Sequence, residues 1–369
     1  MTAPTSTRER SPSHAPSRTA ERRSRQRLST ERHRLEASRR RHRTRLARRA
    51  RRAAGAGAAL LILLAVLALV LTQELAPAAP SPATLTVLTH QPAVSSVAVG
   101  EGSGWLTDDR TDTLVRFDPS TGRRLGPSLS VPGRPVDVVT AAGHVWVASM
   151  LTNTVEEIAP DHLRLVRTLP VPSGPVGMAW DGGLLWVASV LAGDVTAIDP
   201  YDGRIVATSH IASGAVRIAA GGSSVWVTGS TDTVAEVSPR PAGGRLHWRT
   251  IVVGRSPLGV AAGPRAVWVA DAGAGTVTEI DPATGRVVGT YRTGPDPVAV
   301  APMPGTEGAT AWVADGQADD VRAVGAGAGS GGVGPVAHLG GTPRQMVVAG
   351  AAVWTAIGNP GTVVSVQGG

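Results

Sequence analysis

The stretch Ala266-Val267-Trp268-Val269-Ala270-Asp271 decides the fold of this chain, because its pattern recurs six more times at nearly constant spacing. Successive tryptophans of the pattern lie 41, 40, 40, 42, 44 and 42 residues apart. The full set is Trp105, Trp146, Trp186, Trp226, Trp268, Trp312 and Trp354. Self-similarity at a period of about 40–45 residues is typical of a β-propeller with one four-stranded blade per repeat. The sequence therefore predicts an all-β fold, a seven-bladed β-propeller.

A second marker repeats with the tryptophans. A short apolar run precedes each tryptophan, and it opens with Pro92, Pro135, Pro175, Ala215, Pro257, Pro297 or Pro343. Repeat five shows the elements most clearly, with strands expected at 258–261, 266–270, 276–280 and 287–292. The segment Asp281-Pro282-Ala283-Thr284-Gly285-Arg286 reads as a tight turn, in which proline presets φ and glycine supplies a positive φ. Because similar turns begin at Asp118 and Asp199, we interpret these Asp and Arg residues as structural.

The seventh repeat contains only three strands before the chain stops at Gly369. They are expected at 344–348, 353–357 and 362–366. The apolar segment at 84–90 precedes Pro92 as an outer strand precedes Pro297, so it can supply the missing strand. We therefore expect the N-terminal strand to complete the last blade and to close the ring, which removes open sheet edges.

Charge divides the chain sharply. Residues 1–52 hold 18 Arg and 4 Glu and carry +14, whereas residues 53–369 hold 18 Arg and 24 acidic residues and carry −6. The first segment lacks apolar periodicity, so we expect a basic and largely disordered tail at 1–52. Its arginines suit contact with anionic lipid headgroups. Nucleic-acid binding is the disfavoured alternative, because no aromatic residue is interleaved to stack bases.

The tail is followed by an uncharged apolar segment. We expect a transmembrane helix at 53–72, long enough to cross most of the hydrocarbon core, and an extended proline-rich linker at 73–83. A cleaved signal peptide is the alternative, but its basic region would be far shorter. The basic flank stays in the cytoplasm, so we expect a single-pass protein of the cell membrane. The propeller at 84–369 would then lie outside the cell.

The repeats resemble the YVTN-type repeat, whose pattern reads VWVAN, then TVSVID, then a turn and a VGxxP exit. Val267-Trp268-Val269-Ala270-Asp271 and Thr276-Val277-Thr278-Glu279-Ile280-Asp281 carry the resemblance, which covers residues 84–369. Asp or Ser stands here where the family often has Asn. The resemblance implies a seven-bladed propeller that serves as an extracellular, cell-surface or periplasmic binding scaffold. Streptogramin (virginiamycin B) lyase is a more distant resemblance.

That second resemblance raises an enzymatic alternative, a metal-assisted lyase with a catalytic histidine and nearby carboxylates. The propeller histidines do not show this pattern beside the tryptophan strands; they are His90, His144, His162, His210, His247 and His338. The chain contains no cysteine, which excludes disulfides, cysteine nucleophiles and thiolate metal sites. We therefore expect a binding scaffold without catalytic residues, cofactor or metal; a purely structural spacer is the third alternative.

Strands alternate in direction within a blade, so the loops divide between two faces. One face gathers the stereotyped turns. The other gathers the loops after the second strand and the connections between blades, which vary from repeat to repeat and suit binding of an extracellular ligand or protein. Solvated loop charges are the alternative interpretation. The candidate partner-binding residues on this variable face are Arg110, Arg134, Asp137, Arg217, Arg255, Asp271, Asp296, Asp315, Arg344 and Gln345, of which Asp137, Arg217 and Gln345 open inner strands at equivalent positions near the channel mouth.

Overall fold

The computed structural model of the chain describes residues 86–91, 93–211, 214–240, 243–326, 328 and 332–367. The chain separates into two units at Ala76, and the described residues all belong to the second. The basic tail, the predicted membrane span at 53–72 and the linker at 73–83 lie outside them. Within the described residues, no helix has the length and apolar character needed to cross a membrane.

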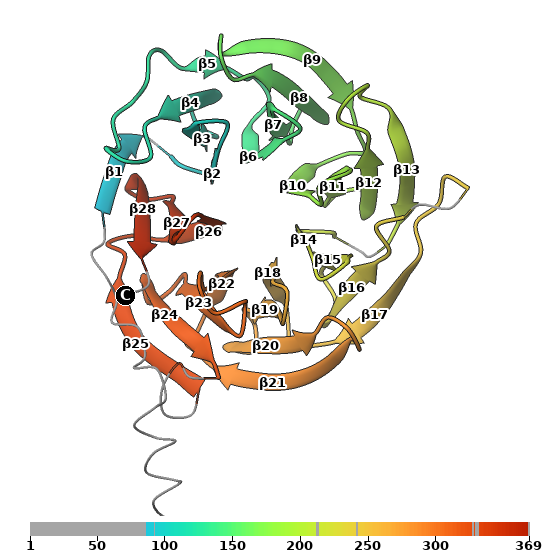
Figure 1. Cartoon of the computed structure of the whole chain (residues 1–369), viewed down its shortest axis with the longest axis vertical. Coiled ribbons are helices and arrows are strands. Elements are labelled where there is room, and N and C mark those ends of the chain that lie inside the picture. Colours follow the sequence, from blue (N-terminus) through green and yellow to red (C-terminus); the bar gives the residue numbers. More distant parts are fainter. Residues whose placement is uncertain are drawn as a thin grey trace, which may run out of the picture. The chain divides into compact units, whose positions relative to one another are not determined.

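Seven four-stranded antiparallel sheets form the described part of the chain and surround a central channel (Figure 1). Each sheet is one blade, with its first strand innermost. Blade 1 is β2 (Ser96–Gly100), β3 (Ser103–Asp108), β4 (Thr113–Phe117) and β5 (Leu129–Ser130); blade 2 is β6 (Pro135–Ala141), β7 (His144–Ser149), β8 (Thr154–Ala159) and β9 (Arg164–Pro170); blade 3 is β10 (Pro175–Trp180), β11 (Leu185–Ser189), β12 (Asp194–Ile198) and β13 (Ile205–His210).

The remaining blades follow the same order. Blade 4 is β14 (Arg217–Gly221), β15 (Ser224–Thr228), β16 (Thr233–Val237) and β17 (Trp248–Val252); blade 5 is β18 (Pro257–Ala262), β19 (Val267–Asp271), β20 (Thr276–Asp281) and β21 (Arg286–Arg292); blade 6 is β22 (Pro297–Pro302), β23 (Thr310–Asp315), β24 (Asp320–Gly325) and β25 (Val333–His338). Blade 7 has β26 (Pro343–Ala349), β27 (Ala352–Ile357) and β28 (Gly361–Gln367), and β1 (Thr86–Gln91) pairs antiparallel with β28.

The seven-bladed architecture predicted from the repeats is confirmed, and strand ends differ by only a residue or two from those expected. The turns also behave as predicted. Backbone N–H groups of Ser120, Tyr201 and Ala283 donate to the carboxylates of the aspartates that open their turns. The glycines at the ends of these turns have φ of 69°, 77° and 67°; they are Gly122, Gly203 and Gly285.

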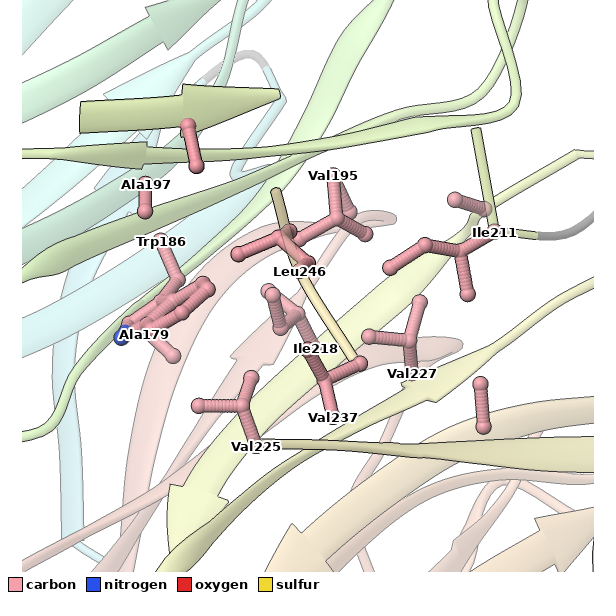
Figure 2. Close-up of a cluster of buried hydrophobic side chains, with 14 residues drawn as sticks. Ala179, Trp186, Val195, Ala197, Ile211, Ile218, Val225, Val227, Val237 and Leu246 are labelled. Carbon is pink, nitrogen blue, oxygen red and sulfur yellow. The ribbon is translucent and has the colours of Figure 1, made fainter. Parts of the chain in front are cut away.

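The hydrophobic core lies between blades. Seven clusters of buried side chains occur among the described residues, one at each interface between neighbouring blades, and each contains one tryptophan of the repeat. At the interface of blades 3 and 4, Trp186 lies beside Ala179 while Val225 and Val227 approach from the next blade (Figure 2). Six of the seven tryptophans are fully buried, and Trp354 is 5% exposed. All seven are therefore core residues.

The indole N–H groups are used as well. Those of Trp105, Trp146 and Trp226 donate to the carbonyl five residues earlier, at the end of the inner strand, over 3.0–3.2 Å. The N–H of Trp268 instead donates to the carbonyl of Gly308 in the next blade at 2.9 Å. In these four blades the tryptophan thus joins apolar packing between blades to a hydrogen bond that fixes the ring, whereas the indole N–H of Trp312 has no partner among the described residues.

Replacement of Trp268 by alanine should lower the free energy of unfolding by about 3–5 kcal/mol, because it leaves a cavity between blades 5 and 6. Chemical denaturation measures this effect. His144→Ala is the matched comparison, since the His144 side chain is 36% exposed, and it should be nearly neutral. Equal losses from the two substitutions would contradict the inter-blade core.

Candidate binding site at the channel mouth

Each blade has one equivalent residue near the start of its inner strand, and together these seven residues surround one end of the channel. They face the position two residues after the tryptophan on the second strand, as Asp137 faces Ala148 and Arg217 faces Thr228. Six of them lie nine residues before their tryptophan, and repeat six has a longer interval. We call this set the mouth ring; it contains Ser96, Asp137, Gly177, Arg217, Gly259, Ala299 and Gln345.

A local irregularity positions several members of the mouth ring. The inner strands of blades 2, 3, 6 and 7 open with a proline, and the register shifts before the ring residue two positions later. Proline has no N–H and suits the first position of a strand, while a bulge re-aims the side chain that follows it. This arrangement places the side chains of Asp137 and Gln345 at the channel.

Asp137 is the centre of a hydrogen-bond network across the ring. Its Oδ1 accepts from the Ser96 hydroxyl at 2.7 Å, from the Val138 N–H at 3.0 Å and from Nε2 of Gln345 at 3.0 Å. Its Oδ2 accepts from the N–H of Met178 at 2.6 Å. These partners lie on β2, β6, β26 and β10, so a single carboxylate connects four consecutive blades. The sequence pattern did not single out Ser96, although its interval to Trp105 equals that of Asp137 to Trp146.

Gln345 and Arg217 extend the network to either side. Oε1 of Gln345 accepts from the N–H of Val97 at 3.0 Å, so both ends of this amide are occupied. Nη1 of Arg217 donates to the carbonyls of Val176 at 3.2 Å and Val216 at 3.4 Å. The structure therefore brings Asp137, Arg217 and Gln345 together at the channel, as their equivalent positions in the sequence suggested.

Burial dominates the electrostatics of the network. Asp137 is only 4% exposed, and loss of hydration raises its pKa, while the Ser96 hydroxyl and the charge of Arg217 oppose the shift. Burial likewise lowers the pKa of Arg217, with the charge of Asp137 opposing this and the charge of Arg344 adding to it. A guanidinium stays protonated under ordinary conditions. The mouth therefore combines two guanidinium groups with one buried carboxyl group, whose ionised form burial disfavours and its hydrogen bonds favour.

The channel itself forms a cavity of about 650 Å³. Residues from all seven inner strands line it, and beyond the mouth ring these are mainly valines, alanines and glycines. Trp180, Pro302 and Pro304 line it as well, and they follow the ring residues along their strands. A cavity lined mainly by apolar side chains, with convergent polar groups at one end, has the general character of a small-molecule site.

The remaining predicted residues are separate from the network. Arg110 and Arg255 are exposed in loops, and Nε of Arg134 lies 3.4 Å from Oδ2 of Asp109. Arg344 is exposed and lines the channel beside Gln345. Asp296 is half-buried, and burial and the nearby carboxylate of Asp315 raise its pKa.

The buried aspartates at the ends of the tryptophan strands hold loops. Oδ1 of Asp315 accepts from the N–H groups of Gln317 and Ala318, and its Oδ2 accepts from the N–H of Asp296. Asp271 accepts from the hydroxyls of Thr276 and Thr278 at 3.2 and 2.6 Å. Its other oxygen has no hydrogen-bond partner among the described residues. Burial raises the pKa of Asp271 to about 6.

Histidines and carboxylates lie in pairs in this structure. Nδ1 of His144 is 3.4 Å from Glu157, and Nδ1 of His210 is 3.2 Å from Asp194. In the segments that the structure describes, no three such residues gather in a group able to hold a metal ion.

This chain is similar to solved propeller structures over nearly the whole length of those structures. A streptogramin B lyase is similar at a TM-score of 0.64 with 16% identity, over 78% of this chain and 98% of that one. A catalytically inactive virginiamycin B lyase from Staphylococcus aureus with quinupristin gives 0.64 and 15%, over 77% and 99%. The Pan2 WD40 domain of Neurospora crassa gives 0.64 and 12%, over 79% and 98%.

The likeness is one of fold. A lyase and a WD40 domain match equally well, so the architecture does not select an activity. No curated protein and no protein-family model matches the chain. The resemblance to YVTN-type repeats therefore depends on the repeat residues themselves.

Asp271→Asn should change how stability depends on pH. The Asp271 carboxyl group binds a proton more tightly in the folded state than in the unfolded state, where its pKa is near 3.8. The stability that protonation of Asp271 contributes is therefore complete below about pH 4 and is lost as pH rises through about 6. The unfolding free energy of the variant minus that of the parent should therefore rise by about 1–3 kcal/mol between pH 4 and 7. Urea titrations at several pH values measure it, with exposed Asp161→Asn as the control. A difference that stays constant over this range would refute the role of Asp271.

Proposed function

We propose that this protein is a membrane-anchored extracellular propeller that binds a ligand or a protein at its variable face, without catalysis. The observation that carries the proposal is the Asp137 network at the mouth of an apolar cavity of about 650 Å³. A buried carboxylate is costly to maintain, and this one accepts four hydrogen bonds and interacts with the charge of Arg217. Such a fixed polar rim above an apolar interior suits recognition of another molecule.

The lyase alternative has weaker support. It depends on likeness of fold to streptogramin B lyase at 16% identity, and WD40 domains share that likeness. The binding function, in contrast, needs no catalytic residues and uses only the channel mouth and the loops around it. Incubation with quinupristin distinguishes the alternatives, since ring opening of this compound by the chain would favour a lyase.

The membrane part of the proposal comes from the sequence. The uncharged segment at 53–72, preceded by 18 arginines, suits a single-pass anchor with a cytoplasmic N-terminus. The arginines of the tail would contact anionic headgroups at the inner surface. Strand β1 runs toward the connection that enters β2, so its start lies at the face of the stereotyped turns. The variable face would then be directed away from the bilayer.

A cysteine-based capture experiment tests both location and face. Arg110→Cys lies on the variable face and Ala283→Cys on the opposite face; both residues are exposed, and the chain has no native cysteine. Intact cells receive a membrane-impermeant maleimide that carries a photo-crosslinker. Both variants should be labelled, and only Arg110→Cys should yield a reproducible adduct. Absence of labelling at both sites would overturn the extracellular location, and equal adduct yields would overturn the binding face.

Ring closure by β1 belongs to the same proposal. Deletion of residues 84–90 removes the fourth strand of blade 7 and exposes the edge of β28, so it should lower stability by several kcal/mol. Thermal unfolding of the full chain in detergent measures the loss. Deletion of residues 1–40 is the control and should leave the melting temperature unchanged. Two deletions with the same melting temperature would show that the ring does not depend on β1.

A further inference from the structure

Two arginines of the channel mouth form no ion pair with a described residue. Arg217 on β14 and Arg344 on β26 both line the cavity, and they lie close enough for their charges to interact. In the part of the chain that the structure describes, no carboxylate lies at ion-pair distance from either guanidinium. Like charges repel, and burial of Arg217 adds to the cost of keeping both charged. A bound anion would offset that cost.

The neighbouring carboxylate of Asp137 offsets part of this cost through its charge, but it forms no ion pair with Arg217. Both oxygens of Asp137 are occupied by neutral donors, namely the Ser96 hydroxyl, the Gln345 amide and two backbone N–H groups. Even an ionised Asp137 would balance only one of the two guanidinium groups, so the mouth keeps a net positive charge. Nη1 is the only nitrogen of Arg217 that donates a hydrogen bond to a described residue. The other guanidinium N–H groups of Arg217 can therefore donate to a ligand.

The space beside Arg344 is preserved by a glycine. Nε of Arg344 lies where a side chain at residue 358 would begin, so Gly358 in the loop between β27 and β28 admits the guanidinium. Below the mouth most side chains that line the cavity are apolar, among them Val99, Val139 and Met178. At the other end, Glu307 is paired with Arg265 at 2.7 Å. The charge available to a ligand is therefore concentrated at the mouth.

We propose that Arg217 and Arg344 together bind the carboxylate of a small organic acid whose apolar body enters the channel. This inference rests on the proposed binding function and names the class of ligand. Guanidinium groups match a planar carboxylate through parallel N–H donors, and hydrogen bonds between ionised groups are about twice as strong as neutral ones. A cavity of about 650 Å³ accommodates a body of one or two rings.

The test uses the full chain in lipid nanodiscs and 4-fluorobenzoate as the probe, with binding followed by ¹⁹F relaxation and empty nanodiscs subtracted. The parent should bind 4-fluorobenzoate at least about tenfold more tightly than 4-fluorobenzyl alcohol, which has the same body without the charge. Arg217→Gln and Arg344→Gln should each weaken binding by about tenfold or more. Arg164→Gln is the matched control, an exposed arginine on β9 outside the cavity lining and outside the candidate binding residues, and it should change binding less than twofold.

Several outcomes would overturn the inference. They are absence of 4-fluorobenzoate binding by the folded parent, equal binding of the alcohol, and equal behaviour of Arg344→Gln and Arg164→Gln. Displacement of the probe by inorganic phosphate at equal concentration would also count against it, because the apolar channel would then contribute nothing. Arg344 is exposed, so its variant remains informative if Arg217→Gln fails to fold. An adduct at Arg110 without binding of these acids would leave the scaffold function standing and reject only the ligand class.

Discussion

Burial of one tryptophan at each interface between neighbouring blades is the interaction on which the ring depends. A four-stranded sheet alone has two apolar faces and cannot hide either. In this protein the tryptophan of each blade packs toward the following blade, and the last one, Trp354, packs toward the first. Phe117 contacts Trp354 there with ring centroids 5.9 Å apart, and Gly104 leaves the space that the Phe117 ring occupies. The closing interface is thus filled by a residue type that occurs once in the chain.

The seven-bladed architecture could be predicted from the sequence because the residues that determine it recur in every repeat. The tryptophans, the prolines and the turns at Asp118, Asp199 and Asp281 all repeat, and a repeat reports the same packing several times. The mouth ring is also periodic, which is why Asp137, Arg217 and Gln345 were found. The hydrogen bonds among its members were not predictable, since they depend on a register shift and on which rotamers meet across the channel. Ser96 was missed because serine at a strand start is common and carries no charge.

Charge at the ends of the tryptophan strands illustrates the limit of reading function from residue type. Asp271 and Asp315 are near neighbours of the variable loops, yet both are buried and hold the loops of their own blades. A sequence does not show whether an aspartate is exposed or buried, and only its hydrogen-bond partners in the structure distinguish the two cases. The binding role of these residues stays a prediction, while their structural bonds are visible.

The mouth ring also determines how recognition can diversify on this scaffold. Its seven positions surround one axis, so exchange of a side chain alters the entrance without altering the blades. Two positions are closed to such change, because a Cβ at Gly259 would lie 2.9 Å from the carbonyl of Val298 and one at Gly177 would lie 3.2 Å from that of Val216. The other five positions carry a side chain, so substitutions there would change the shape and charge of the channel entrance.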